Sequence, residues 1–162
     1  MLKEVTIPTI VVIGDQSHGK SSVLENIARI TLPKGMGCVT KTPLELKLRR
    51  RDPNGLKQHD YATIRHAKMV EGELKDIDDL NQIETEIARL SKEITDSERL
   101  PIVNVPIYLT IYRENQIDLS MIDLPGMTYM KTEDAGTKLN KLIKQMWRHY
   151  ISKKNAVILL TI

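Results

Sequence analysis

The sequence is short of several residue types that mark particular classes of protein. It has one cysteine, Cys38, four histidines and no phenylalanine in 162 residues. A single thiol forms no internal disulfide and suits a reducing compartment. Four scattered histidines beside one cysteine give no metal-ligand spacing. An aromatic content of 4% argues against a base-stacking surface. These shortages exclude a disulfide scaffold and disfavour a Cys/His metal site and a nucleic-acid partner.

Long hydrophobic runs and an excess of one charge are also missing. The uncharged stretches are 5–14, 100–112 and 155–162, all shorter than the roughly 18–20 apolar residues that span a bilayer. The first stretch reads as a buried strand rather than a signal peptide, because it contains Pro8, follows Glu4 and precedes no small-residue cleavage site. The 24 Lys+Arg and 21 Asp+Glu give a net charge of only +3. The composition, 41% apolar and 28% charged, favours a soluble intracellular globular domain.

Hydrophobic spacing predicts strands that alternate with helices. The predicted strands are 10–13, 43–48, 61–69, 105–112, 117–124 and 156–162, and the predicted helices are 21–30, 76–95 and 137–150. The 43–48 segment alternates as an edge or antiparallel strand does, and 61–69 is the second strand of that unit. The four residues between 112 and 117 have the spacing of an antiparallel hairpin. The expected fold is α/β, a three-layer α/β/α sandwich with a mostly parallel sheet and an antiparallel hairpin edge.

The strongest motif lies between the first strand and the first helix. Residues 14–21 read GDQSHGKS and fit the phosphate-binding loop (P-loop) pattern G-x-x-x-x-G-K-S/T. Gly14 and Gly19 let the backbone curl so that successive amides face a phosphate at the start of the helix. Lys20 would place its charge against the β- and γ-phosphates, and the Ser21 hydroxyl would bind Mg²⁺. The flanking strand and helix are the context that the pattern requires, so it predicts nucleotide binding.

Two weaker motifs gain meaning from this loop. Asp123 begins the sequence DLPG at the end of strand 117–124, where a carboxylate can reach the Mg²⁺ shell, and the Gly126 amide can approach the γ-phosphate. Thr40 lies in a glycine-containing loop and can add a second hydroxyl to Mg²⁺. Alone, D-x-x-G usually marks a turn, and a lone loop threonine is usually a cap or turn residue. Both interpretations therefore depend on the upstream loop.

The chain resembles the start of a dynamin-superfamily GTPase domain, with the closest likeness to the Mx proteins and the Mx-like plant dynamin-related proteins. The resemblance is carried by GDQSHGKSSVLENIARITLPKGMGCVTKTPLELKL at 14–48, IDLPGMTYM at 122–130 and YISKKNAVILLTI at 150–162. These segments follow the family's order and spacing. The resemblance implies that residues 1–162 are the N-terminal part of a GTPase domain that hydrolyses GTP to GDP and phosphate with Mg²⁺. The guanine-reading half and the stalk would lie outside it.

The resemblance also implies roles for individual residues. The implied catalytic residues are Gln16, which orients the attacking water, Ser17, Lys20 and Thr40. The implied Mg²⁺ ligands are Ser21, Thr40 and Asp123, and a monovalent cation (K⁺ or Na⁺) would be held by Ser17, Gly35 and Gly37. The switch region would be Val39, Thr40 and Lys41. The implied nucleotide-binding residues are Gly14, Asp15, Gln16, Ser17, His18, Gly19, Lys20, Ser21, Ser22, Asp123, Leu124, Pro125 and Gly126.

The family's partners set further expectations. Its members self-assemble, dimerise through their GTPase domains and act on membranes, and some associate with microtubules. We therefore expect GTP/GDP, copies or full-length relatives of the chain, and a membrane surface or microtubules as partners, in the cytoplasm and without nucleic acid. The chain departs from the family at His18, where a small Ser or Ala is usual, and at Lys41, which replaces Arg. It also lacks the guanine-reading motif T-K-x-D.

Two alternative functions remain open on the sequence. The chain could be a truncated, non-catalytic fragment that binds phosphate weakly or docks on full-length relatives through its apolar strand 156–162. It could also be a P-loop ATPase of another family, because the guanine motif is missing. The basic cluster of Lys47, Arg49, Arg50 and Arg51 is interpreted as a solvated strand end rather than a surface for lipid or a filament. Cys38 is interpreted as incidental.

Overall fold

The computed structural model describes residues 7–14, 19–33, 40–70, 73–126 and 133–161. The elements in chain order are β1 (Thr9–Gly14), α1 (Lys20–Ala28), β2 (Leu44–Arg50), β3 (Tyr61–His66), β4 (Lys75–Ile77), the 3₁₀ helix η1 (Leu80–Gln82), α2 (Ile83–Glu98), β5 (Ile107–Arg113), β6 (Leu119–Asp123), α3 (Glu133–Ile151) and β7 (Ala156–Thr161). None of the helices so described is long and apolar enough to cross a membrane.

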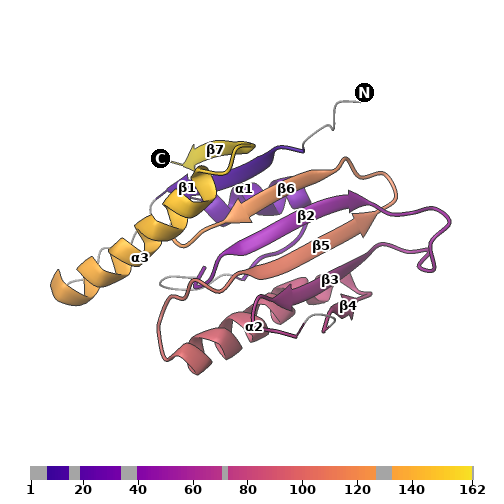
Figure 1. The fold of residues 1–162 in the computed structure, drawn as a ribbon. Helices are drawn as coiled ribbons and strands as arrows, with labels where there is room; N and C mark the ends of the chain where they lie inside the picture. The colour runs from indigo at the N-terminus through magenta and orange to yellow at the C-terminus, as the bar shows by residue number, and fades with distance from the viewer. Residues whose placement is uncertain (1–6, 15–18, 34–39, 71–72, 127–132, 162) are drawn as a thin grey trace.

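The seven strands form one mixed sheet in the order β4-β3-β5-β2-β6-β1-β7 (Figure 1). Strand β1 lies parallel to both β6 and β7, and β2 lies parallel to β5. The pairs β2–β6, β3–β4 and β3–β5 are antiparallel. Both pairs that include β1, where the phosphate loop begins, are therefore parallel, and the two pairs at the far edge of the sheet are antiparallel.

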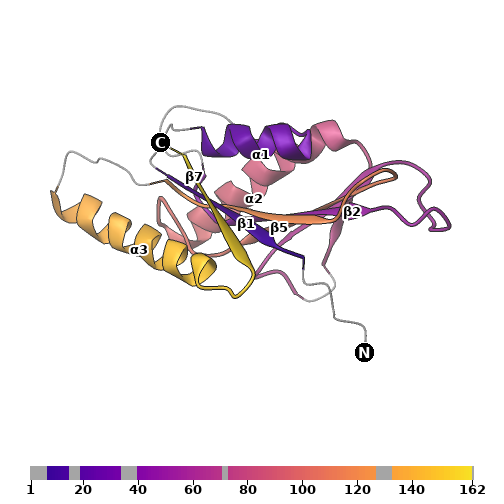
Figure 2. The same ribbon diagram turned by 90° about the horizontal axis from the view of Figure 1, so that it is seen from above.

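The helices cover the two faces of the sheet unequally. Figure 2 shows α1 and α3 on opposite sides of the sheet. The larger core lies under α1 and α2, where Leu46 of β2 and Leu109 of β5 pack in one cluster with Leu24 and Leu90. On the other face Val11, Ile122, Leu124 and Tyr150 form a smaller core with α3. The three-layer α/β/α expectation is confirmed, and no described helix crosses the face of β2, β5 and β3 seen in Figure 1.

The expected hairpin between residues 105–112 and 117–124 is wrong. The two segments are β5 and β6, but β2 lies between them, parallel to β5 and antiparallel to β6. Their short connection passes over the end of β2, where the Asp118 carboxylate accepts the Arg50 backbone N–H at 3.0 Å. Strand β2 is therefore central rather than an edge strand, although its antiparallel pairing was expected. The antiparallel pair at the sheet edge is β3–β4.

Several boundaries differ from the sequence expectation, and two of these differences change how a segment pairs. The predicted strand 61–69 ends at His66 as β3, and it pairs with β5 rather than with the 43–48 strand. The predicted helix 76–95 starts later, because residues 75–77 pair with β3 as β4. Asp79 then accepts the Asn81 backbone N–H at 3.0 Å and starts the helical run. Ile77 was predicted to be buried because it belongs to the apolar stripe of the helix. It is buried, but it lies on strand β4 rather than on the helix.

Candidate nucleotide and magnesium site

The two glycines that bound the predicted phosphate loop have conformations that suit glycine. Gly14 ends β1 with a φ of 153°, and an added Cβ would lie 2.3 Å from Oγ1 of Thr161 on β7. Gly19 precedes α1 in the left-handed region, with a φ of 75°. A side chain at Gly14 would collide with β7, and one at Gly19 would be strained. The backbone geometry therefore requires glycine at both positions, as the motif does.

Three predicted Mg²⁺ ligands from distant parts of the chain meet at one point. The Ser21 hydroxyl donates to Asp123 Oδ2 at 2.9 Å, and the Thr40 hydroxyl donates to the same oxygen at 3.0 Å. The two hydroxyl oxygens are 3.5 Å apart. Ser21 is in the first turn of α1, Thr40 precedes β2, and Asp123 ends β6. The sheet therefore brings together an oxygen cluster that the sequence spreads over about a hundred residues.

Asp123 is the carboxylate of this cluster, and it is buried. Its residue is 2% exposed, and desolvation raises its pKa although the hydrogen bonds from Ser21 and Thr40 and the charge of Lys20 act to lower it. Its Oδ1 is buried and has no hydrogen-bond partner among the described residues. A buried carboxylate oxygen without a donor needs an explanation, and a bound ion is one that fits a carboxylate. Mg²⁺ prefers carboxylate and hydroxyl oxygens, so these residues fit that ion.

The other predicted nucleotide-binding residues fall into two groups. Lys20 is the first residue of α1 and is buried, and Ser22 is exposed one residue after Ser21. Asp15, Gln16, Ser17, His18, Gly35, Gly37 and Val39 lie outside the described residues, as does Cys38. The predicted water-orienting residue and the monovalent-cation site thus stay predictions.

The segment that follows Asp123 is held by a contact that the sequence did not reveal. Leu124, Pro125 and Gly126 are all buried. Trp147 of α3 donates its indole N–H to the Pro125 carbonyl oxygen at 3.0 Å. The sequence shows Trp147 only as part of an apolar helical face. The spacing of residues does not reveal which carbonyl oxygen its indole N–H will bond. Helix α3 therefore holds the backbone that leads away from the oxygen cluster.

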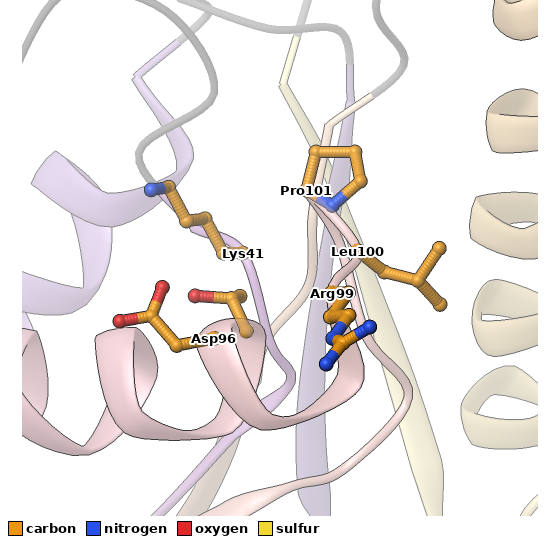
Figure 3. A pocket seen from close by; sticks show the side chains of 6 residues that line it. Lys41, Asp96, Arg99, Leu100 and Pro101 are labelled. Carbon is orange, nitrogen blue, oxygen red and sulfur yellow. The ribbon is translucent and has the colours of Figure 1, made fainter.

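The segment after Thr40 is anchored on the other side of the site. The Lys41 carbonyl oxygen accepts the Val103 backbone N–H at 2.9 Å. The exposed Lys41 side chain borders a pocket of about 520 Å³, whose other residues are Thr95, Asp96, Arg99, Leu100 and Pro101. Figure 3 shows Lys41 above the end of α2, on the side of Asp96, with Arg99 and Pro101 opposite. Lys41 is thus in contact with the α2–β5 connection.

The basic cluster is only partly a solvated strand end. Lys47 and Arg50 are exposed. Arg49 donates to the Leu119 carbonyl oxygen at 3.1 Å, and the buried Arg51 donates to the Lys57 carbonyl oxygen at 3.2 Å. Two of the four cations are therefore committed to contacts within the protein, at the end of the sheet opposite Asp123.

The chain is similar to curated proteins over almost its whole length. The chain is 38% identical over 166 residues to vacuolar protein sorting-associated protein 1 of Schizosaccharomyces pombe, covering 96% of this chain and 24% of the relative. It is 37% identical to phragmoplastin DRP1A of Arabidopsis thaliana (95% and 24%). It is 34% identical to the interferon-induced GTP-binding protein Mx2 of Ictalurus punctatus (99% and 24%). The chain thus spans about a quarter of the length of these curated relatives.

The fold and the loop sequence between β1 and α1 define a P-loop nucleotide-binding domain of the α/β class. The sequence pattern of the dynamin family matches residues 10–162. The chain therefore belongs to the dynamin family.

Proposed function

We propose that the chain binds GTP together with Mg²⁺ and that this site serves the hydrolysis of GTP to GDP and phosphate. The observation that supports the proposal most directly is the convergence of the Ser21 and Thr40 hydroxyls on the buried Asp123, at 2.9 and 3.0 Å. The hydroxyls come from the phosphate-loop helix and from the predicted switch segment, so one ion held between them would link the two. Family membership supports GTP as the nucleotide.

In the proposed mechanism each residue has a defined task. Ser21, Thr40 and Asp123 would hold Mg²⁺, which when bound neutralises charge on the phosphate oxygens. Lys20 would stabilise the transferred phosphoryl group, and the backbone amides of the loop would donate to its oxygens. Gln16 and Thr40 would orient the attacking water, and Ser17 with Gly35 and Gly37 would hold a K⁺ or Na⁺ ion. Leu124, which is buried directly after Asp123, would help to keep water away from the cluster.

The wider role follows from the family and is equally a proposal. We propose that the domain works as the N-terminal part of a dynamin-type GTPase domain, in a protein that associates with copies or relatives of itself. Membrane surfaces or microtubules in the cytoplasm are its proposed places of action. The name of the Ictalurus relative describes that protein as GTP-binding, which supports the nucleotide but not the location.

Binding of a fluorescent GTP analogue to the full chain tests the proposed nucleotide. We expect Mg²⁺-dependent binding that Lys20→Ala weakens at least about tenfold, the effect of losing one charge-assisted hydrogen bond of about 1.5–3 kcal/mol. Lys47→Ala is the matched control, because Lys47 is exposed on β2, and it should bind as the parent does. Equal binding by Lys20→Ala would contradict the proposed site. ATP that displaces the analogue as well as GTP does would contradict the base assignment.

A second candidate is a domain that docks on relatives without hydrolysing GTP. It is favoured by β7, where Val157, Ile158 and Leu160 are each at least half exposed on a sheet-edge strand. Phosphate release separates the two candidates. Release by the parent chain well above that of Lys20→Ala supports hydrolysis. Equal release by the two, with nucleotide binding retained in the parent, supports docking alone.

A further inference from the structure

Helix α1 ends in a strained backbone. Its last helical residue is Ala28, and Arg29 follows with a φ of 51° in the left-handed region that glycine usually occupies. The last turn of α1 contains no basic residue of its own. The final carbonyl groups of a helix carry partial negative charge and lack donors within the helix. This end of α1 therefore needs donors from elsewhere in the chain.

Arg113 supplies those donors from the end of β5. Its Nη1 donates to the Ala28 carbonyl oxygen at 2.6 Å, and its Nη2 donates to the Arg29 carbonyl oxygen at 2.9 Å. The Asp60 carboxylate lies 4.0 Å from its Nε. The Arg113 side chain is 17% exposed, and burial lowers its pKa, but an arginine stays charged in proteins. A planar fork can hold two successive carbonyls in a fixed orientation, which an ammonium group cannot.

The same helix carries the nucleotide site at its other end. Lys20 and Ser21 form the first turn of α1, and Ser21 donates to Asp123. A helix of nine residues is a rigid rod about 13 Å long. Arg113 belongs to β5, which pairs with β2, and β2 in turn pairs with the strand that ends in Asp123. Fixing α1 against the end of β5 therefore fixes where Ser21 stands relative to Asp123.

We propose that Arg113 is a positioning residue for the nucleotide and Mg²⁺ site, acting through α1. The role rests on the proposed function, because it concerns the same site. It is separate from the phosphate loop, since Arg113 binds the opposite end of the helix. Mutation of residues that hydrogen-bond metal ligands typically lowers metal affinity by about 10–100-fold, and Arg113 would act on the proposed ligand Ser21 through the length of α1.

Arg113 can be replaced without leaving a sealed void. Its side chain borders one surface hollow of about 570 Å³ with Ile27 and Glu114, and another of about 390 Å³ with Glu25 and Asn81. The residue therefore lies beside surface hollows rather than in a closed cavity. Arg113→Ala removes the two donors, and Arg113→Lys keeps the charge at the helix end but loses the fork. The matched control is Arg50, which lies opposite Arg113 in the β2–β5 register with an exposed side chain.

The test measures the Mg²⁺ concentration that gives half-maximal binding of the fluorescent GTP analogue, below the melting transition of each variant. We expect Arg113→Ala to require about tenfold more Mg²⁺ than the parent chain and Arg113→Lys to fall between them. Arg50→Ala should match the parent. A purely structural role would lower the melting temperature and leave the Mg²⁺ requirement of the folded protein unchanged.

The outcomes separate this role from the proposed function. If the parent binds the analogue with Mg²⁺ and both Arg113 variants match it, the positioning role is overturned and the proposed function stands. If the parent itself shows no Mg²⁺-dependent binding, the proposed function is overturned and the role falls with it. Should Arg113→Ala not fold, Arg113→Lys decides, because a parent-like Mg²⁺ requirement in that variant overturns the role.

Discussion

At the scale of single residues, Asp123 combines a cost to folding with a proposed function. Its carboxylate is 2% exposed, and one of its oxygens has no donor among the described residues. Burial of a charged group is unfavourable unless partners compensate it, and here Ser21 and Thr40 compensate one oxygen only. The arrangement is the one expected where a residue is retained for a ligand rather than for stability.

The first prediction follows from this buried charge, of which only one oxygen accepts hydrogen bonds from described residues. Asp123→Asn keeps the shape of the side chain and removes the buried charge, so the free energy of unfolding should stay the same or rise by about 1 kcal/mol. Mg²⁺-dependent binding of the GTP analogue should fall at least about tenfold. Urea unfolding and fluorescence titration measure the two quantities. Asp52→Asn, in an exposed turn, is the control, and a loss of stability above about 2 kcal/mol in Asp123→Asn would contradict the account.

The residues of this cluster were predictable from sequence, whereas the residues that support it were not. Lys20, Ser21 and Asp123 stand in motifs whose spacing reports their chemistry, and Thr40 was inferred from the pair. Trp147 and Arg113 act on backbone carbonyls of Pro125 and Ala28. Such contacts depend on which elements the fold brings together, and no local pattern records them.

At the scale of elements, the link between β4 and α2 depends on a nearly buried acid. Glu86 accepts from Lys75 of β4 at 2.7 Å and from Arg89 of its own helix at 3.1 Å, with 11% of its side chain exposed. The hydrogen bond from Lys75 lowers the pKa of Glu86, burial opposes that effect, and Arg89 adds to it. The ionised form of Glu86 therefore stabilises the fold.

The second prediction concerns the pH dependence of this link. Because the folded pKa of Glu86 is lowered, its contribution is present above the unfolded carboxyl pKa of about 4.3 and is lost as the pH falls through the folded value. Glu86→Gln should lower the free energy of unfolding by about 1 kcal/mol near neutral pH, since its partners are half exposed. The difference from the parent should shrink near about pH 3.

Chemical denaturation at the two pH values measures this difference. Glu84→Gln serves as the control, because Glu84 lies in the same first turn of α2 and makes no ion pair among the described residues. A deficit of Glu86→Gln that is equal at both pH values would show that packing, rather than the ionised carboxylate, carries the effect.

Element types were easier to predict from sequence than the order of the strands. The apolar stripe of α2 and the β-branched run of β1 report local geometry, and both elements formed. The place of β2 between β5 and β6 was not predicted, because a four-residue gap is compatible with a hairpin and with a connection that passes over one strand. The hydrogen bond from the Arg50 backbone N–H to Asp118 belongs to the second arrangement, and it is seen only in the folded structure.

At the scale of the whole molecule, the two edges of the sheet differ. One edge is the short strand β4, whose Lys75 and Asp76 are exposed. The other edge is β7, with the sequence AVILLT and no charge. Short or charged edge strands resist pairing with other chains, whereas long apolar edges invite it. The fold therefore concentrates its capacity for association at β7, on a strand that also contacts Gly14 of the phosphate loop.

The last prediction is that this edge controls the self-association of the 162-residue chain. Leu160 is 61% exposed on β7, so Leu160→Lys should place a charge on the edge and change the free energy of unfolding by no more than about 0.5 kcal/mol. Analytical ultracentrifugation over a range of concentrations should show association for the parent and less for this variant. Leu56→Lys changes an equally apolar residue that is fully exposed in a turn, and it should associate as the parent does. An equal effect of both substitutions would assign association to general hydrophobicity, and a parent that is monomeric throughout would contradict the role of β7, because an unprotected apolar edge should then have had a partner.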